Sequence, residues 1–242
     1  MPGHGPSTNG ERRLAAYFLP PTPWEVVQQF QERLVYEMGE PPRRRAALVL
    51  VEHPSIVTIG RQGSRSQLID CENESFDVRF VNRGGAAWLH SPGQIALYGI
   101  LPLDPPKLGI ERLREGLYET MFGALEDFQL CGERDESNGG VLVKDRQIAS
   151  VGAAVKGWVS CFGGTINVAL PKDRANVLCP HPALTARKET CMLRERLLPV
   201  RPGAIRETLA RRFAAAFGYN GYYLCPNPPM PKPRTIHHAV VQ

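Results

Sequence analysis

The stretch Leu48-Val49-Leu50-Val51-Glu52-His53-Pro54-Ser55-Ile56-Val57-Thr58-Ile59-Gly60-Arg61 contains two runs of β-branched and aliphatic residues on either side of a proline. The first run, residues 46–52, is almost wholly apolar, which is typical of a strand buried on both faces of a sheet. The second run, residues 56–59, is a shorter strand that follows the turn at Pro54. A β-sheet therefore begins in this part of the chain.

The sequence around these strands predicts helices. Thr22 as cap, Pro23 at the first helical position and Glu25 three residues after Thr22 predict a helix over residues 23–38. The order of elements indicates an α/β (α+β) fold in which helices flank a mixed β-sheet. Apolar residues at helical spacing predict two further helices, over residues 110–130 and 204–217. Alternating or apolar runs predict further strands over residues 78–82, 95–101, 141–143, 147–151, 155–159 and 165–170, with a hairpin turn at 144–146.

The length of 242 residues favours a single domain. We expect a disordered lead-in over residues 1–14, a folded domain over 15–224 and a proline-rich flexible tail over 225–242. The longest apolar run, residues 46–51, is far too short to cross a bilayer. Six cysteines without a CxxC pair indicate reduced thiols, and the predicted compartment is the cytoplasm.

The net charge of +5 does not by itself indicate a nucleic-acid site. Most of the basic residues alternate with glutamates, and the one compact run, Arg43-Arg44-Arg45, is short. An acidic protein partner fits the positive excess equally well. We expect a monomer that binds neither nucleic acid nor a membrane.

A glycine-rich segment follows the strand predicted over residues 78–82. It reads Arg83-Gly84-Gly85-Ala86-Ala87-Trp88-Leu89-His90-Ser91-Pro92-Gly93-Gln94. Paired glycines let a backbone approach a ligand, and Arg83, His90 and Gln94 offer a charge and hydrogen-bond donors beside it. The alternative is a tight connection between two strands in which the glycines only turn the chain.

Two later segments also carry residues that can bind or react. Residues 160–168 contain a second glycine pair, Gly163-Gly164, which either faces a ligand or forms a bulge in a hairpin. Residues 177–182 place the thiol of Cys179 two positions before the imidazole of His181. A loop cysteine is a candidate nucleophile, whereas most cysteines are small core residues.

Together, and in this order, these segments resemble the octanoyltransferase family, whose fold is that of the biotin and lipoate protein ligases. Residues 48–61 are similar to the family's strand, EHP turn and TxGR signature. The resemblance continues in Arg83-Gly84-Gly85 with His90 and the Pro-Gly-Gln of residues 92–94. It then runs through residues 148–152 and through Gly163 with Asn167-Val168. It implies a single domain like the catalytic domain of those ligases.

The resemblance also implies an activity. In this family a cysteine takes an octanoyl group from acyl carrier protein as a thioester and passes it to a lysine of a lipoyl domain. The acceptors are lipoyl domains of 2-oxoacid dehydrogenases or the glycine cleavage H protein, and no cofactor or metal is needed besides the acyl donor. Cys179 stands where the family places the nucleophile, and Cys161 and Cys191 are alternatives.

One position departs from the family pattern. The family has a lysine before Ile-Ala-Ser, and its ammonium keeps the cysteine ionised and moves protons, whereas this chain has Gln147. An amide carries no charge. A unit charge about 4 Å away, at an effective dielectric near 20, is worth roughly 4 kcal/mol, so its loss should return the thiol pKa towards about 8.5. Lys144, Lys156 and His181 are the candidate replacement bases, with Lys144 expected in the hairpin turn.

Two further substitutions make the expected pocket more apolar. Trp88-Leu89 stands where the family has Thr-Tyr, and Phe162 stands where it has His, so an acyl tunnel could be narrowed. Two other functions stay open: a non-catalytic relative that binds acyl groups or lipoyl domains, and an ATP-using ligase, for which no Gly-Gly-Gly run is present. The predicted acyl and substrate contacts are Arg83, Gly84, Gly85, Trp88, His90, Gly93, Gln94, Ser150, Val151, Gly152, Gly163, Gly164 and Thr165, with Cys179, position 147 and His181 as the catalytic group.

Overall fold

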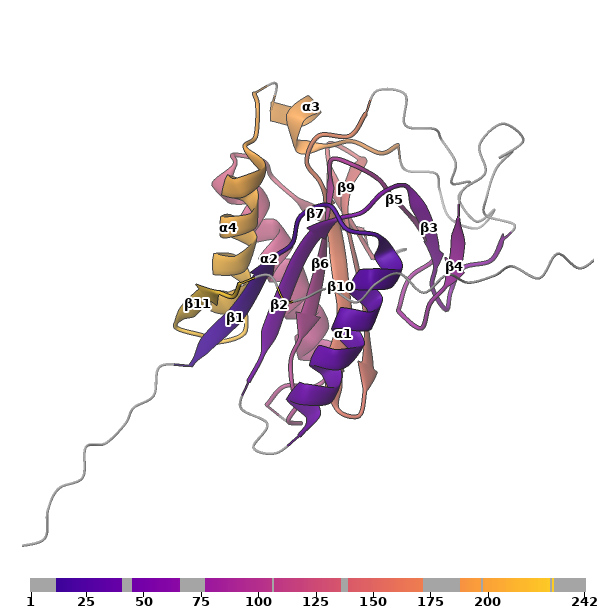
Figure 1. The fold of residues 1–242 in the computed structure, drawn as a ribbon. Helices are drawn as coiled ribbons and strands as arrows, with labels where there is room; N and C mark the ends of the chain where they lie inside the picture. The colour runs from indigo at the N-terminus through magenta and orange to yellow at the C-terminus, as the bar shows by residue number, and fades with distance from the viewer. Residues whose placement is uncertain are drawn as a thin grey trace, which may run out of the picture.

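An eight-stranded mixed sheet runs through the centre of the computed structural model (Figure 1). The structure describes residues 12–40, 45–65, 77–105, 107–135, 139–171, 188–196, 198–226 and 228. The strand order in this sheet is β11-β1-β2-β6-β10-β9-β8-β7, where β1 runs parallel to β2 and β11 and the other neighbours are antiparallel. The strands are β1 (Arg13–Phe18), β2 (Ala47–Glu52), β6 (Gln94–Ile100), β7 (Glu133–Asp135), β8 (Gly140–Val143), β9 (Arg146–Lys156), β10 (Val159–Asn167) and β11 (Gly221–Leu224).

Helices cover both faces of the large sheet. Figure 1 shows α1 (Trp24–Gly39) in front of it and α2 (Ile110–Asp127) behind it, with α4 (Pro202–Ala216) beside α2 and the short α3 (Met192–Arg196) at one end. Strand β2 explains the continuous apolar run in the sequence. Leu48 and Leu50 pack into the core on the side of α2 and α4, and Val49 and Val51 pack into the core under α1.

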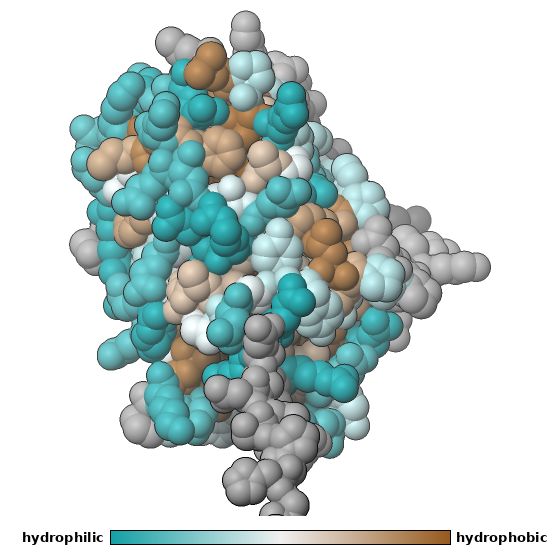
Figure 2. Space-filling model, turned by 90° about the vertical axis from the view of Figure 1, so that its left-hand side faces the viewer, coloured by the Kyte–Doolittle hydropathy of each residue, from teal (hydrophilic) through white to brown (hydrophobic). Residues whose placement is uncertain are grey.

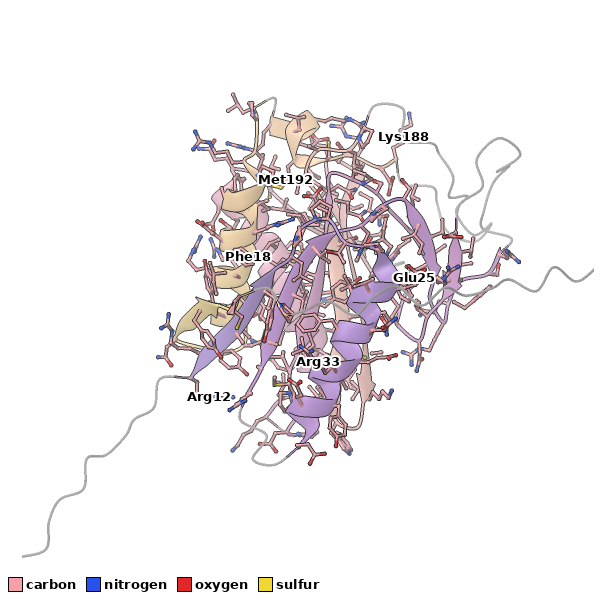
Figure 3. All side chains as sticks on the ribbon, viewed as in Figure 1. Arg12, Phe18, Glu25, Arg33, Lys188 and Met192 are labelled. Atoms are coloured by element: carbon pink, nitrogen blue, oxygen red, sulfur yellow. The ribbon has the colours of Figure 1, made fainter. Side chains whose placement is uncertain are left out.

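A second sheet of three strands lies beside the first. Its order is β4 (Val78–Phe80), β3 (Ile56–Ile59) and β5 (Ala87–His90), with β3 parallel to β4 and antiparallel to β5. Glu25, labelled on the first turn of α1 in Figure 3, accepts an ion pair from Arg79 of β4 at 2.9 Å. The small sheet is therefore attached to α1 as well as to the chain that leads from β2.

The three predicted helices are confirmed, but the predicted cap of α1 is wrong. The hydroxyl of Thr22 donates to the Pro20 carbonyl at 2.7 Å, and no side chain caps the helix. The backbone N–H of Thr22 donates to Glu52 of β2 at 3.0 Å. Tertiary pairing thus orients this residue away from the end of the helix. Among the described helices, none is long and apolar enough to span a membrane.

The hairpin predicted around residues 144–146 is confirmed. Lys144 and Asp145 both have positive φ, as a two-residue type I′ turn requires, and β9 resumes at Arg146. The strand predicted over residues 155–159 is wrong, because a second such turn at Gly157-Trp158 interrupts it. Residues on both sides of this turn pair with each other in the long β9–β10 hairpin, and β10 ends at Asn167 instead of running to 170.

Five elements have no counterpart in the sequence prediction: β1, β5, β7, β11 and α3. Strand β1 begins at Arg13, inside the lead-in predicted over residues 1–14, so that boundary is corrected. The strand forms because β2 and β11 supply hydrogen bonds from distant parts of the chain. Residues 1–11 and 229–242 lie outside the described residues, so the remaining lead-in and tail predictions are not tested.

We predict that Gly99→Ala lowers the free energy of unfolding by about 1–3 kcal/mol. A Cβ at Gly99 of β6 would lie 2.8 Å from the ring of Phe213 in α4, so the ring would have to move within a packed core. Gly203→Ala is the matched control, because nothing lies within 4 Å of a Cβ there. Urea unfolding of both variants measures the difference, and equal effects would contradict the packing argument.

Candidate active site

The segment that contains Gly84 and Gly85 holds the small sheet against the large one. The N–H of Gly84 donates to the Ala153 carbonyl of β9 at 3.1 Å. A Cβ on Gly152 would come within 2.6 Å of the Gly84 carbonyl oxygen, and a Cβ on Gly60 within 2.3 Å of that of Gly85. Only glycine permits these two approaches. The glycines therefore bring β9 and the end of β3 each into direct backbone contact with the Gly84-Gly85 segment.

The side chain of Arg83 lies inside this junction and is 1% exposed. It donates to the carbonyl oxygens of Gly84, Ala86 and Thr58 and to the Thr58 hydroxyl, at 2.8–3.0 Å. Its guanidinium carbon lies 3.5 Å from the ring centroid of Trp88. Burial lowers the pKa of Arg83 to about 9, so the group stays charged at neutral pH. These contacts make Arg83 the anchor of the glycine segment.

A buried polar chain continues from Thr58 towards α1. The Nε2 atom of His90 lies 3.1 Å from the Thr58 hydroxyl, and the ring of His53 lies 5.4 Å from that of His90. His53 donates from Nδ1 to the Thr22 carbonyl at 2.7 Å, so its Nε2 accepts from the Tyr98 hydroxyl at 2.7 Å. Both bonds are satisfied by a neutral imidazole, and burial lowers the pKa of His53 to about 4.

Aromatic side chains fill the interior space between this chain and the second glycine pair. Phe162 has a φ of +61°, and its N–H donates to the buried Gln31 of α1 at 2.6 Å. The Phe162 ring lies 6.3 Å from that of Tyr98, and Trp88 closes another side. The remaining cavity has a volume of about 10 Å³, enough for one water at most. It is lined by Trp24, Thr58, Arg83, Trp88, His90, Ala96, Leu97, Tyr98, Phe162, Gly163 and Gly164.

Gln147 lies near the start of β9, at the end of the sheet near Lys188 (Figure 3). Its side-chain amide donates to the Ser150 hydroxyl at 2.8 Å, and Ser150 pairs across the strands with Thr165. The backbone of Gln147 bonds to residues 188 and 190. Polar groups at this end also link Gln94 to Asn167 at 2.9 Å, and Asn167 to the Thr190 carbonyl at 3.0 Å.

Two of the three candidate bases, Lys144 and Lys156, lie in the described residues. Lys144 lies in the hairpin turn, as predicted, and its ammonium is 3.8 Å from the carboxylate of Glu195. Lys156 ends β9 nine residues from Gln147, about 30 Å away along a strand. No hydrogen bond within the described residues joins either ammonium to the Gln147 side chain. His181 and Cys179 lie outside the described residues.

The two alternative nucleophiles are buried. Burial raises the pKa of Cys161 to about 11, so its thiol is protonated at neutral pH. Cys191 is fully buried. Cys161 lines a cavity of about 500 Å³, so the raised pKa of its thiol is what counts against it as a nucleophile, whereas Cys191 has no exposed surface.

A larger cavity of about 520 Å³ lies on the other face of β9, against α2. We call it the α2 cleft. Gly84, Gly85, Val151 and Gly152, four of the predicted contact residues, line it, whereas Gly93 lies elsewhere and donates its N–H to Glu52. Among the described residues, its lining is Arg61, Gln62, Gly84, Gly85, Ala86, Ile110, Leu113, Arg114, Leu117, Tyr118, Arg134, Asp135, Gly139 and residues 151–155.

The sequence of this chain matches the lipoyl protein ligase A/B catalytic domain over residues 24–216. The chain belongs to this family. The octanoyltransferase of Syntrophotalea carbinolica is 34% identical over 150 residues, 61% of this chain and 68% of that protein. The octanoyltransferase of Syntrophobacter fumaroxidans is 40% identical over 124 residues, 50% of this chain and 54% of that protein, so this match spans about half of the relative. The family resemblance found in the sequence is confirmed.

The fold is also similar to that of a bipartite lipoate protein ligase from Thermoplasma acidophilum, solved within an archaeal lipoylation system. The TM-score is 0.70 at 14% identity, and the match covers 88% of each chain. At this identity the likeness shows the fold, and it confirms the predicted mixed sheet flanked by helices.

Three residues that shape the site are absent from the predicted contact residues: His53, Tyr98 and Gln31. Gln31 had a visible signal, because it interrupts the apolar face of α1 between Val27 and Leu34. Tyr98 had none, since its strand is apolar on both sides.

We predict that His53 makes stability fall as the pH drops from about 6.5 to about 4. Its pKa is about 4 in the folded protein, against about 6.5 when unfolded, so the unfolded chain binds a proton in this window that the folded chain excludes. The loss should reach about 3 kcal/mol below this range. Urea unfolding of wild type and His53→Gln between pH 7 and pH 4 measures it; parallel pH profiles would contradict the assignment.

Proposed function

We propose that this chain is an octanoyltransferase that moves an octanoyl group from acyl carrier protein to a lysine of a lipoyl domain. The observation that carries the proposal is family membership over residues 24–216, together with relatives named octanoyltransferase at 34% and 40% identity. These relatives favour transfer over binding alone. The lipoyl-domain partner is supported by the structural neighbour, which was studied with its E2 lipoyl domain.

The reaction proceeds through a thioester on Cys179. The Cys179 thiolate attacks the carbonyl carbon of the donor thioester, and the carrier's sulfur leaves and takes up a proton. The lysine amine then attacks the new thioester, loses a proton and releases the cysteine sulfur. The position of Cys179 in the family pattern supports this assignment, and the raised pKa of Cys161 and the complete burial of Cys191 favour it over these two alternatives.

The proposed reaction needs a group that activates the Cys179 thiol, and Gln147 does not provide one. Its amide already donates to Ser150 and carries no charge that could hold the nucleophile ionised. His181, two residues after Cys179 in the sequence, is the proposed base. A neutral imidazole there would take the thiol proton during attack and return it to the leaving sulfur. We place the reaction in the cytoplasm, carried out by a monomer without a cofactor.

Cys179→Ser should abolish a thioester that wild type forms with octanoyl-acyl carrier protein. Intact mass spectrometry before and after hydroxylamine detects this adduct, since hydroxylamine cleaves thioesters. Cys131→Ser is the matched control and should leave the adduct unchanged, because Cys131 is exposed and is not among the described residues that line the cavities. An adduct of equal yield on Cys179→Ser would show that another thiol is the nucleophile.

Gln147→Lys should raise the rate of acyl loading at pH 7, up to about 30-fold. A thiol with a pKa near 8.5 is only a few per cent ionised at that pH, and a neighbouring ammonium can bring it close to full ionisation. Gln147→Met is the control, as it removes the amide without adding charge. The pH dependence of thiol alkylation should shift to lower pH in the lysine variant alone; identical profiles for both variants would place the nucleophile away from position 147.

A further inference from the structure

The α2 cleft combines an apolar wall with positively charged side chains. Leu113, Leu117 and Val151 belong to the core cluster between α2 and β9, with Ala153 and Val155 packed against it. Ile110, at the first residue of α2, is 66% exposed and marks the mouth. A ligand in this cleft therefore meets aliphatic side chains on one side and solvent at the opening.

Cations outnumber carboxylates in the described lining. Arg61, Arg114 and Arg134 line the cleft, and Asp135 is the carboxylate among the described lining residues. Glu115 neutralises Arg134, which it meets at 3.0 Å, and reaches Arg114 only at 3.7 Å. Arg61 forms no ion pair with any carboxylate in the described ranges. Three arginines against the carboxylates of Asp135 and Glu115 leave one positive charge in excess. Arg61 and Arg114, which Glu115 does not hold closely, are the two arginines that can meet an anionic ligand.

The cleft also adjoins the proposed site of acyl transfer. Its lining in β9 begins at Val151, four residues from Gln147, which is about 13 Å along a strand. It continues to Val155, so a linear ligand laid along this stretch of β9 would have one end directed towards Gln147. The backbone of Gly84 and Gly85, where no side chains project, forms one of its walls.

We infer that the α2 cleft binds the phosphopantetheine arm of the acyl donor, with the phosphodiester at Arg61 and Arg114 and the aliphatic part of the arm on Leu113, Leu117 and Val151. This inference rests on the proposed function, in which the acyl group arrives as a thioester. A thioester carries no charge, so the anion that the arginines attract is the phosphate of the carrier arm. Arginine suits a phosphate because its donors match the phosphate oxygens in pairs.

The test compares two small donors that differ in one group, octanoyl-phosphopantetheine and octanoyl-pantetheine. Arg61→Gln and Arg114→Gln should each raise the KM of acyl loading about tenfold for the phosphorylated donor and leave the unphosphorylated donor unchanged. Arg33→Gln, on the opposite face of the sheet in α1, is the control and should affect neither. Equal changes with both donors, or none with either, would overturn the inference.

Two variants of opposite charge at the mouth of the cleft test the inference without the risk that an arginine variant misfolds. Ile110 is exposed, so neither Ile110→Glu nor Ile110→Lys disturbs the core. The glutamate should repel the phosphate and raise KM about tenfold for the phosphorylated donor, whereas the lysine should leave it equal or lower. The same KM for both variants would count against a phosphate at this mouth.

Two further measurements distinguish binding of the phosphopantetheine arm from binding of the carrier protein surface, and failure of this inference from failure of the proposed function. The arginine effects should be the same for octanoyl-coenzyme A and octanoyl-acyl carrier protein; an effect confined to the carrier protein would mean that the arginines contact the protein surface instead. Calorimetric titration with octanoyl-phosphopantetheine measures binding without turnover. Binding that depends on Arg61 and Arg114 but yields no covalent adduct would refute the transferase and retain the site.

Discussion

The guanidinium of Arg83 brings a positive charge into the interior of the protein and meets only oxygens of its own chain and the face of Trp88. A buried charge is costly unless its donors are satisfied, and here four hydrogen bonds from two nitrogens meet that demand. Three of those bonds end on backbone carbonyls of β3 and the glycine segment. The loop that contacts β9 can therefore adopt this conformation only when Arg83 is in place.

The anchored loop borders two cavities beside β9, and a third cavity of about 500 Å³ lies between α1 and the turn of the β9–β10 hairpin. On the side of α1, Trp88 and Phe162 leave a cavity of about 10 Å³ beside Gly163 and Gly164. On the side of α2, the cleft measures about 520 Å³ and carries the arginines. An octanoyl chain that enters the smaller cavity must displace one of the aromatic rings. Both rings are held, since the Phe162 N–H donates to Gln31 and the Trp88 ring lies against the Arg83 guanidinium.

The residues that shape the site are in place, but position 147 lacks the charge that the proposed chemistry needs. The fold keeps the arginine, the glycine pairs and the buried histidines in place, yet position 147 holds an amide bonded to Ser150. In the proposed mechanism, the absence of a cation there means that the nucleophile is activated by a group from elsewhere in the chain. The two candidate lysines are unsuited, because Lys144 faces Glu195 in a turn and Lys156 lies at the far end of β9, and the neighbouring Arg146 is itself paired with Glu195.

The sequence by itself determined the family, the mixed sheet flanked by helices, the three long helices and the β8–β9 hairpin, because each rests on local periodicity, turn chemistry or a motif. It also identified Arg83, His90 and the glycine pairs as special. Only the tertiary structure decided that Arg83 serves its own backbone, that Gln31 reaches Phe162 across 131 positions, and that β1 and β11 form an edge of the sheet. Those contacts join residues far apart in the chain, and no local pattern encodes a pairing whose partner is defined only once the chain has folded.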